Sequence, residues 1–183
     1  MKELSLHILD IVQNSLAAGA TLVDIGIEEQ PQKGDFLEIM ITDNGRGMKK
    51  EEVAKVLDPF FTTRTTRKVG LGLPLFQQNA IHCDGCFDIE SDLGNGTTVR
   101  AKFKHSHLDR APLGDMCATL LTLIVLNPDV DFHYIHRIGE KQFELDTREI
   151  RNELDDVPLN NPVVVDFLRE FIGENYSNLT GGE

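Results

Sequence analysis

A carboxylate and two closely spaced glycines directly follow an apolar run that has the character of a buried strand. The segment is Asp43-Asn44-Gly45-Arg46-Gly47-Met48, and it comes straight after Leu37-Glu38-Ile39-Met40-Ile41. Strand interiors reject aspartate, and glycine lets a ligand approach the backbone closely. The pattern therefore indicates a ligand-binding carboxylate. A plain turn after a strand gives the same letters, so this segment alone leaves both interpretations open.

Two oxygen-bearing side chains share one face of an expected N-terminal helix. Asp10 and Asn14 are four residues apart, and His7 lies on the same face one turn earlier. A carboxylate and an amide oxygen beside a phosphate site suit Mg²⁺, which keeps several waters and takes few protein ligands. The alternative is that Asp10 and Asn14 form only the polar face of this helix. His7 is expected to be a polar-face or packing residue.

Three further segments have the composition of ligand-binding loops. They are Asp58-Pro59-Phe60-Phe61-Thr62-Thr63-Arg64, Gly70-Leu71-Gly72-Leu73 and Gly94-Asn95-Gly96-Thr97-Thr98. Adjacent aromatics in a loop predict a flap with a hydrophobic root, although a simple buried anchor fits equally. The glycines of the second segment open an expected helix, whose first backbone amides can bind phosphate oxygens. The third is a hairpin by default, with Thr97 a candidate ligand contact.

These segments are connected by a regular succession of helices and strands. Hydrophobic spacing predicts helices over residues 4–18, 50–57 and 73–82, and strands over residues 21–28, 36–42, 87–91 and 97–104. This order predicts helices stacked on one face of a mixed sheet. The expected fold class is therefore α+β, a two-layer α/β sandwich.

A smaller unit is expected after a polar linker at residues 105–112. It contains an apolar helix over 115–126, a hairpin over 130–138 and 141–145, a helix over 146–154, and a last helix from Asn161-Pro162 that Gly173 stops. We assign residues 1–104 to the first domain, 113–174 to a small α/β C-terminal annex and 175–183 to a flexible tail. The apolar helix is either a partner surface or a helix packed on the first domain.

Charge and composition argue against nucleic acid and membranes as partners of this chain. The net charge of −12 argues against nucleic acid, since phosphate backbones attract positive patches. One segment is locally basic, as a solvated loop or as a phosphate-facing mouth, and it contains Arg46, Lys49, Lys50, Arg64, Arg67 and Lys68. No signal-peptide pattern is visible, and the longest apolar run, residues 116–126, is too short to span a bilayer. We therefore expect no membrane association and a cytoplasmic location.

The cysteines and the later histidines give weaker signals. The chain has three cysteines, an odd number that suggests free thiols in a reducing compartment. Cys83 and Cys86 form a lone C-x-x-C beside His82, and without a second ligand pair an ordinary turn is favoured over a metal or redox site. His133 and His136 are expected on the surface of a strand. No Walker A, Ser-His-Asp or HExxH arrangement is present.

The segments described above are more informative together than singly, because of their order along the chain. Asp-x-x-x-Asn, Asp-x-Gly-x-Gly, the Phe-Phe loop, Gly-Leu-Gly-Leu and Gly-x-Gly-Thr together resemble the GHKL ATPase superfamily. That superfamily includes the ATP-binding domains of sensor histidine kinases, anti-sigma-factor serine kinases, type II topoisomerases and heat-shock chaperones. The resemblance covers residues 1–104. It implies a Bergerat-type ATP-binding fold with ATP and Mg²⁺ as ligands.

The resemblance also implies roles for single residues. Asp43 would accept a hydrogen bond from the adenine amino group, with Gly47 close to the base and Thr97 in support. Asn14 would ligate Mg²⁺, and residues 58–69 would form the lid. The complete expected ATP-binding set is Asn14, Asp43, Gly45, Gly47, Met48, Phe60, Phe61, Thr63, Arg64, Lys68, Gly70, Leu71, Gly72, Leu73 and Thr97. Of these, Arg64 and Lys68 are candidate phosphate contacts from their charge and position alone, which add Arg67 as a third.

The sequence departs from the family pattern at the candidate catalytic residue. Asp10 stands where the topoisomerase and anti-sigma branches carry a glutamate general base, and it is shorter by one methylene. The lid is brief, as in short-lid kinases. The helical segment that carries the phosphorylated histidine of histidine kinases does not precede the ATP module in this sequence, so we expect a stand-alone kinase that phosphorylates a separate protein partner. The alternatives are a nucleotide-switched binding module and a slow ATPase.

Overall fold

A computed structural model describes residues 3–58, 72–155 and 157–181 of the chain. The helices are α1 (Leu4–Ala17), α2 (Lys50–Val56), α3 (Gly72–His82), α4 (Met116–Leu126), α5 (Thr147–Leu154) and α6 (Pro162–Thr180). The strands are β1 (Leu22–Gln30), β2 (Phe36–Asp43), β3 (Cys86–Asp92), β4 (Gly96–Lys104), β5 (Asp131–Ile138) and β6 (Lys141–Asp146). All these elements begin within two residues of the positions that hydrophobic spacing predicts.

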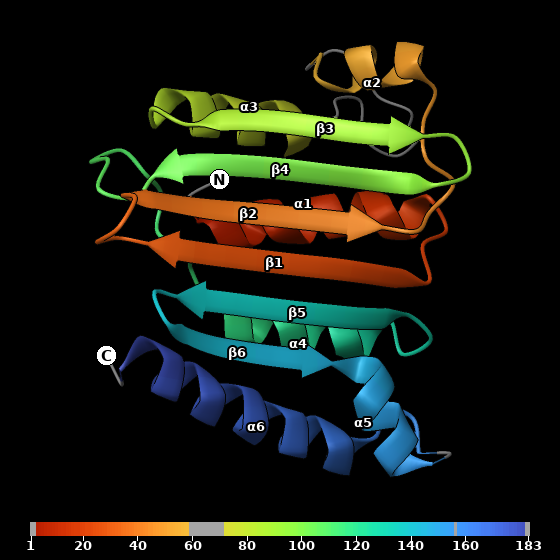
Figure 1. Cartoon of the computed structure of the whole chain (residues 1–183). Coiled ribbons are helices and arrows are strands. Elements are labelled where there is room, and N and C mark those ends of the chain that lie inside the picture. The colour runs from red at the N-terminus through yellow and green to blue at the C-terminus, as the bar shows by residue number, and fades with distance from the viewer. Residues whose placement is uncertain (1–2, 59–71, 156, 182–183) are drawn as a thin grey trace.

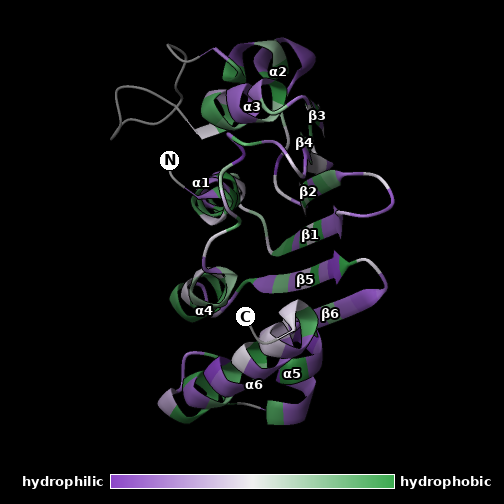
Figure 2. Cartoon of the chain, turned by 90° about the vertical axis from the view of Figure 1, so that its left-hand side faces the viewer, coloured by the Kyte–Doolittle hydropathy of each residue, from purple (hydrophilic) through white to green (hydrophobic). Residues whose placement is uncertain are grey.

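The described strands form one six-stranded sheet in the order β3-β4-β2-β1-β5-β6 (Figure 1). Neighbouring strands are antiparallel except β1 and β5, which are parallel. Helices α3, α1 and α4 lie side by side on one face of the sheet, and none of the described helices covers the other face (Figure 2). The molecule is therefore the α+β two-layer sandwich that the sequence predicts.

Strict alternation of side chains along the strands builds the core. In β1, Val23, Ile25 and Ile27 are buried under the helices, whereas the residues between them are half-buried on the open face. Successive side chains in a strand point to opposite faces, so one face becomes apolar and the other polar. The apolar stripe of α1, which includes Ile8 and Val12, covers the buried face.

The C-terminal segment extends the same sheet. Strand β5 pairs with β1 along its whole length, from Leu22↔Asp131 to Glu29↔Ile138. Helix α4 connects β4 to β5 and buries Met116, Thr119, Leu120, Leu123 and Ile124. It packs against α1 on one side and α6 on the other. Of the two interpretations of this apolar helix, packing against the rest of the chain thus accounts for most of its apolar surface.

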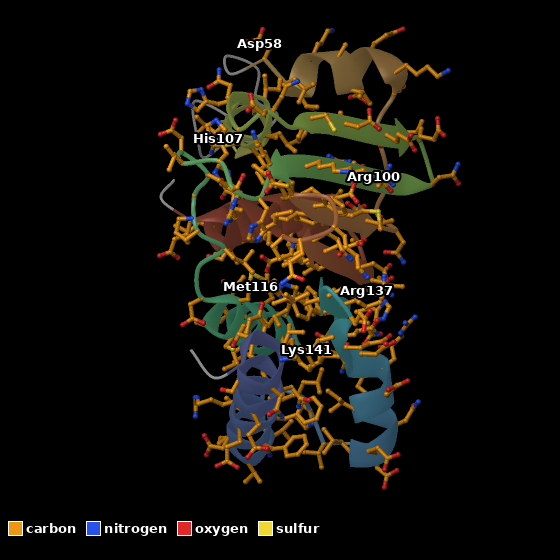
Figure 3. The ribbon with its side chains drawn as sticks, turned by 60° about the vertical axis from the view of Figure 1, so that its left-hand side comes forward. Asp58, Arg100, His107, Met116, Arg137 and Lys141 are labelled. Carbon is orange, nitrogen blue, oxygen red and sulfur yellow. The ribbon has the colours of Figure 1, made fainter. Side chains whose placement is uncertain are left out.

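Helix α6 packs at the β6 edge of the sheet. Its length differs from the prediction. It runs through Gly173 to Thr180, whereas the sequence analysis ended it at Gly173 and expected a loose tail from residue 175. Glycine in a helix costs about 1 kcal/mol relative to alanine, but burial of Ile172 and Leu179 on either side offsets that cost. Lys141 at the start of β6 donates to the carbonyl of Asn178 in the last turns of α6, at 3.3 Å (Figure 3).

Candidate functional site

Asp43 ends β2 and lies buried between α1 and the neighbouring strands. It is opposite Val23 of β1 and Thr97 of β4 in the register of the sheet, and its residue surface is only 7% exposed. The hydroxyl of Ser15 on α1 donates to Asp43 Oδ2 at 2.6 Å, and the backbone amide of Gly45 donates to Oδ1 at 2.9 Å. A buried carboxylate needs such donors to offset its lost hydration.

Three neighbouring segments hold the loop that follows Asp43. The side chain of Asn44 accepts from the backbone amides of Thr21 and Leu22, at 2.8 and 3.0 Å. The amide of Arg46 donates to the carbonyl of Ala18, and the amide of Gly94 donates to the carbonyl of Arg46. The loop is therefore fixed at the end of α1 and against the β3–β4 hairpin, and it does not behave as a plain exposed turn.

Gly47 allows close contact between two backbone segments, whereas the sequence suggested only the close approach of a ligand. Its φ is +65°, and a Cβ at this position would collide with the carbonyl oxygen of Asp92. Backbone contact with the hairpin accounts for the glycine directly. At Gly45, an added Cβ would lie 2.9 Å from Asp43 Oδ1 and 3.0 Å from the Cβ of Ala18. Both glycines thus let the loop fold tightly around the Asp43 carboxylate.

A pair of hydroxyls forms the β3–β4 side of the site. Ser91 Oγ lies 2.9 Å from Thr97 Oγ1, donates to the carbonyl of Gly96 at 2.8 Å and accepts from the amide of Met48 at 2.9 Å. Thr97 is half-buried opposite Asp43, where the sequence analysis expected it to support the base. Ser91 thus connects two of the predicted residues, Met48 and Thr97, through its single hydroxyl group.

Ser15 and Ser91 are site residues that the sequence motifs did not predict, although the position of each carries a signal. Ser15 lies four residues after Ile11, on the apolar face of α1, and is buried. Ser91 follows Phe87 and Ile89 on the inward face of β3. A hydroxyl at a position that the hydrophobic period assigns to the core needs a partner, and such positions indicate a polar site.

Asp10 of α1 lies at the start of α3, and Asn14 is one turn later on α1. Both are half-buried. A Cβ placed on Gly72, the first residue of α3, would be 3.0 Å from Asp10 Oδ2, so this carboxylate lies directly against the helix N-terminus. Leu73 follows Gly72 and is half-buried against the core. The structure therefore brings the predicted base against the start of the predicted phosphate-binding helix, and the predicted metal ligand follows one turn later on α1.

His7 packs beside this group as a buried residue. Its ring stacks on Phe76 of α3 with centroids 5.1 Å apart, and its Nε2 lies 2.9 Å from Asn79 Nδ2. Its Nδ1 has no hydrogen-bond partner among the described residues. Burial lowers the pKa of His7 to about 4, so the ring is neutral near pH 7. This confirms the expectation that His7 is a packing residue.

Part of the predicted site cannot be placed. Phe60, Phe61, Thr63, Arg64, Arg67, Lys68, Gly70 and Leu71 lie outside the described residues. Asp58, the first residue of the expected lid, is exposed after α2, above the β3 edge of the sheet (Figure 3). The described part of the basic segment, Arg46, Lys49 and Lys50, is exposed beside the Asp43 loop.

The remaining candidate residues do not form a second site. Cys83, Cys86 and Cys117 are free thiols, and Cys83 is buried whereas Cys86 is exposed. His133 is half-buried on the open face, but His136 is fully buried, so the expectation that His136 is a surface residue is wrong. Across the described ranges, no group of three or more His, Cys, Asp and Glu residues is placed to hold a metal ion. In the same residues, no helix has the length and apolarity needed to cross a bilayer.

Comparison with known proteins identifies a family. The model of the family "Histidine kinase-, DNA gyrase B-, and HSP90-like ATPase" matches residues 2–107. The non-motile and phage-resistance protein of Caulobacter vibrioides is 30% identical over 120 residues, 61% of this chain and 14% of that protein. A probable C4-dicarboxylate sensor kinase of Halalkalibacterium halodurans is 37% identical over 67 residues, 37% of this chain and 13% of that protein. The chain thus matches a small part of each of these relatives.

A solved structure shows the same fold at low sequence identity. It is described as "Crystal Structure of N terminal domain of a DNA repair protein", with a TM-score of 0.55 and 14% identity. The match covers 80% of this chain and 53% of that chain.

Proposed function

The chain belongs to the family of histidine kinase-, DNA gyrase B- and HSP90-like ATPases, and within this ATP-binding frame we propose that it is a kinase that phosphorylates a separate protein. The observation that carries the proposal is Asp43, a buried carboxylate that ends an inner strand beside a tightly folded glycine loop. The relative described as a probable C4-dicarboxylate sensor kinase favours phosphoryl transfer over other uses of ATP.

The described residues fit ATP and a magnesium ion. Asp43 would accept a hydrogen bond from the 6-amino group of adenine, with Thr97 beside it. The first backbone amides of α3 would face the phosphates, as helix N-termini do. Asn14 would supply an amide oxygen to Mg²⁺, which needs few protein ligands because waters and phosphates complete its shell. The metal would neutralise charge on the phosphates and orient them for transfer.

Asp10 has two possible uses in this arrangement. Its carboxylate lies against Gly72 at the start of α3, close to where the terminal phosphate would be. There it could accept the proton of an attacking hydroxyl group of a protein partner, or that of a water molecule. The second use would make the protein a slow ATPase, and this placement of Asp10 is the observation that favours that alternative.

A protein partner and a reducing compartment are also part of the proposal. The net charge of −12 favours a protein substrate over nucleic acid. Three free thiols suit a reducing, cytoplasmic environment.

The decisive experiment follows the γ-phosphate. The full chain is incubated with γ-labelled ATP, Mg²⁺ and a cell extract, with Asp10→Asn as the matched variant. A labelled partner that is absent with Asp10→Asn supports the kinase. Free phosphate without a labelled protein indicates an ATPase, and tight ATP binding with neither product indicates a nucleotide-switched binding module. Absence of ATP binding overturns the proposal.

A further inference from the structure

Ser15 and Asp43 form a buried pair that joins α1 to the end of β2. Ser15 is 3% exposed and Asp43 is 7% exposed, and their oxygens are 2.6 Å apart. Ser15 Oγ also lies 3.4 Å from the carbonyl of Ile11, the usual position for a helical serine. Ser15 has a single proton, and the shorter contact with the charged acceptor is the stronger one. The hydroxyl is therefore directed at Asp43.

The two donors around Asp43 determine what a ligand can offer to this carboxylate. Ser15 occupies one lone pair of Oδ2, and the Gly45 amide occupies one lone pair of Oδ1. An ionised carboxylate has about four lone-pair positions and no proton to donate. With its orientation fixed from two sides, the carboxylate presents only acceptor positions to the nucleotide.

We propose that Ser15 is the positioning residue that makes Asp43 select a 6-amino purine over a 6-oxo purine. This inference rests on the proposed ATP site. A 6-amino group donates to Asp43, whereas a 6-oxo group places one acceptor against another. Carboxylate torsions are broad when nothing holds them, so loss of the hydroxyl group lets the carboxylate turn. The 6-amino group then loses its aligned acceptor, whereas a 6-oxo group loses no favourable contact, so the discrimination falls.

The test compares two nucleotides that differ at this position. Affinities for ATP and inosine triphosphate are measured by calorimetry with Mg²⁺, on the wild type, on Ser15→Ala and on Ser5→Ala. Ser5 is the matched control because it is buried on the same helix, and its hydroxyl bonds to Glu3 instead of the site. Thermal unfolding of each variant shows that all three are folded at the temperature of the titration.

The wild type is expected to prefer ATP by about a hundredfold or more. Ser15→Ala should weaken ATP binding by about tenfold, leave inosine triphosphate binding unchanged, and so reduce the preference by about tenfold. Ser5→Ala should keep the wild-type preference. Equal weakening of both nucleotides in Ser15→Ala, or no change in either, would overturn this inference while ATP binding by the wild type still supports the proposed site. A wild type that binds neither nucleotide overturns both.

Discussion

Asp43 and Glu29 are buried or largely buried carboxylates at opposite ends of the same two strands, and their surroundings differ in kind. Asp43 ends β2, whereas Glu29 lies near the end of β1, opposite Leu37 near the start of β2. Each oxygen of Asp43 accepts one hydrogen bond from the described residues, and the donors are a small hydroxyl and a backbone amide. Each oxygen of Glu29 instead contacts a histidine at 2.9 Å, Oε1 with His136 and Oε2 with His105.

The contacts of Glu29 continue into the C-terminal segment. Tyr176 on α6 lies 2.8 Å from His136 Nδ1 and 2.8 Å from the hydroxyl of Tyr134. These contacts are all satisfied when Tyr134 donates to Tyr176, Tyr176 donates to His136, and His136 donates to Glu29. Burial alone would raise the pKa of Glu29, but the hydrogen bonds from the two histidines outweigh it and lower that pKa.

The difference fits the two roles that we propose, a carboxylate that binds a ligand at Asp43 and one that joins elements of the fold at Glu29. The ring donors around Glu29 come from β5 and from the segment after β4, so bulky side chains from distant elements close around it. The donors around Asp43 are small, a serine hydroxyl and a backbone amide, and glycine at 45 and 47 keeps side-chain atoms away from the loop. A carboxylate that must take a ligand is held by few atoms, whereas one that joins elements is covered by many.

The largest effect is expected when Asp43 itself is changed. Asp43→Asn should weaken ATP binding by more than a hundredfold, because an amide group can place a donor where the base needs an acceptor, while the fold remains intact. Calorimetry measures the affinity, and circular dichroism checks the fold. Normal ATP affinity in this variant would show that Asp43 does not read the base.

For Glu29 we expect a loss of stability without a loss of ATP binding. Glu29→Gln should lower the free energy of unfolding by about 2–4 kcal/mol, because the buried His136 and the half-buried His105 both lose their charged acceptor. ATP affinity of the folded variant should not change. Urea denaturation measures the stability. Glu28→Gln, on the open face of the same strand, is the control and should stay within about 0.5 kcal/mol of the wild type; an equal loss there would remove the special role of Glu29.

A buried histidine beside the candidate site, His7, extends the comparison to pH. His7 has one unpartnered nitrogen and a pKa lowered to about 4, so the unfolded chain binds its proton more readily than the folded one. Its contribution to stability is therefore complete above about pH 6.5 and is lost as the pH falls toward 4, by up to about 3 kcal/mol.

His7→Leu is the variant that checks this sign. Denaturant unfolding at intervals from pH 4 to pH 7 should show a shallower dependence in His7→Leu than in the wild type. Parallel curves for the two proteins would mean that His7 does not titrate differently on folding.

The smallest effect concerns the metal. Asn14→Ala should weaken ATP binding about tenfold when Mg²⁺ is present and should have little effect with a chelator, since the amide oxygen would act through the ion. Calorimetry under both conditions gives the two values. Equal losses with and without metal would assign Asn14 to direct contact with the nucleotide.

Local rules predicted most of the fold, and the exceptions have identifiable causes. The bounds of α1 and β2 follow from periodicity and from glycines at their ends. Helix α6 passes Gly173 because its buried residues lie on both sides of the glycine, which a stop signal read in isolation ignores. His136 is inward because it alternates with Phe132 and Tyr134, a pattern that predicts burial when it is followed to the end of the strand.

The sequence indicated which residue types belong to the candidate site, but not which atoms contact one another there. Asp43, Thr97 and the start of α3 are in the sequence pattern, whereas the donors to the carboxylate depend on which helix crosses which strand. Ser15 reaches Asp43 across 28 positions of the chain, and no spacing rule joins them. The same limit applies to the pairing of β5 with β1, which brings together strands from the two ends of the chain.

The parallel pairing of β1 with β5 has a practical consequence for anyone who shortens this protein. A fragment that ends at Lys104 would contain every motif of the proposed nucleotide site. It would lack β5, however, so the backbone donors and acceptors on that side of β1 would have no pairing strand. An unprotected edge of this length is a template for strand addition between molecules. A nucleotide-binding fragment made in this way should therefore be expected to self-associate.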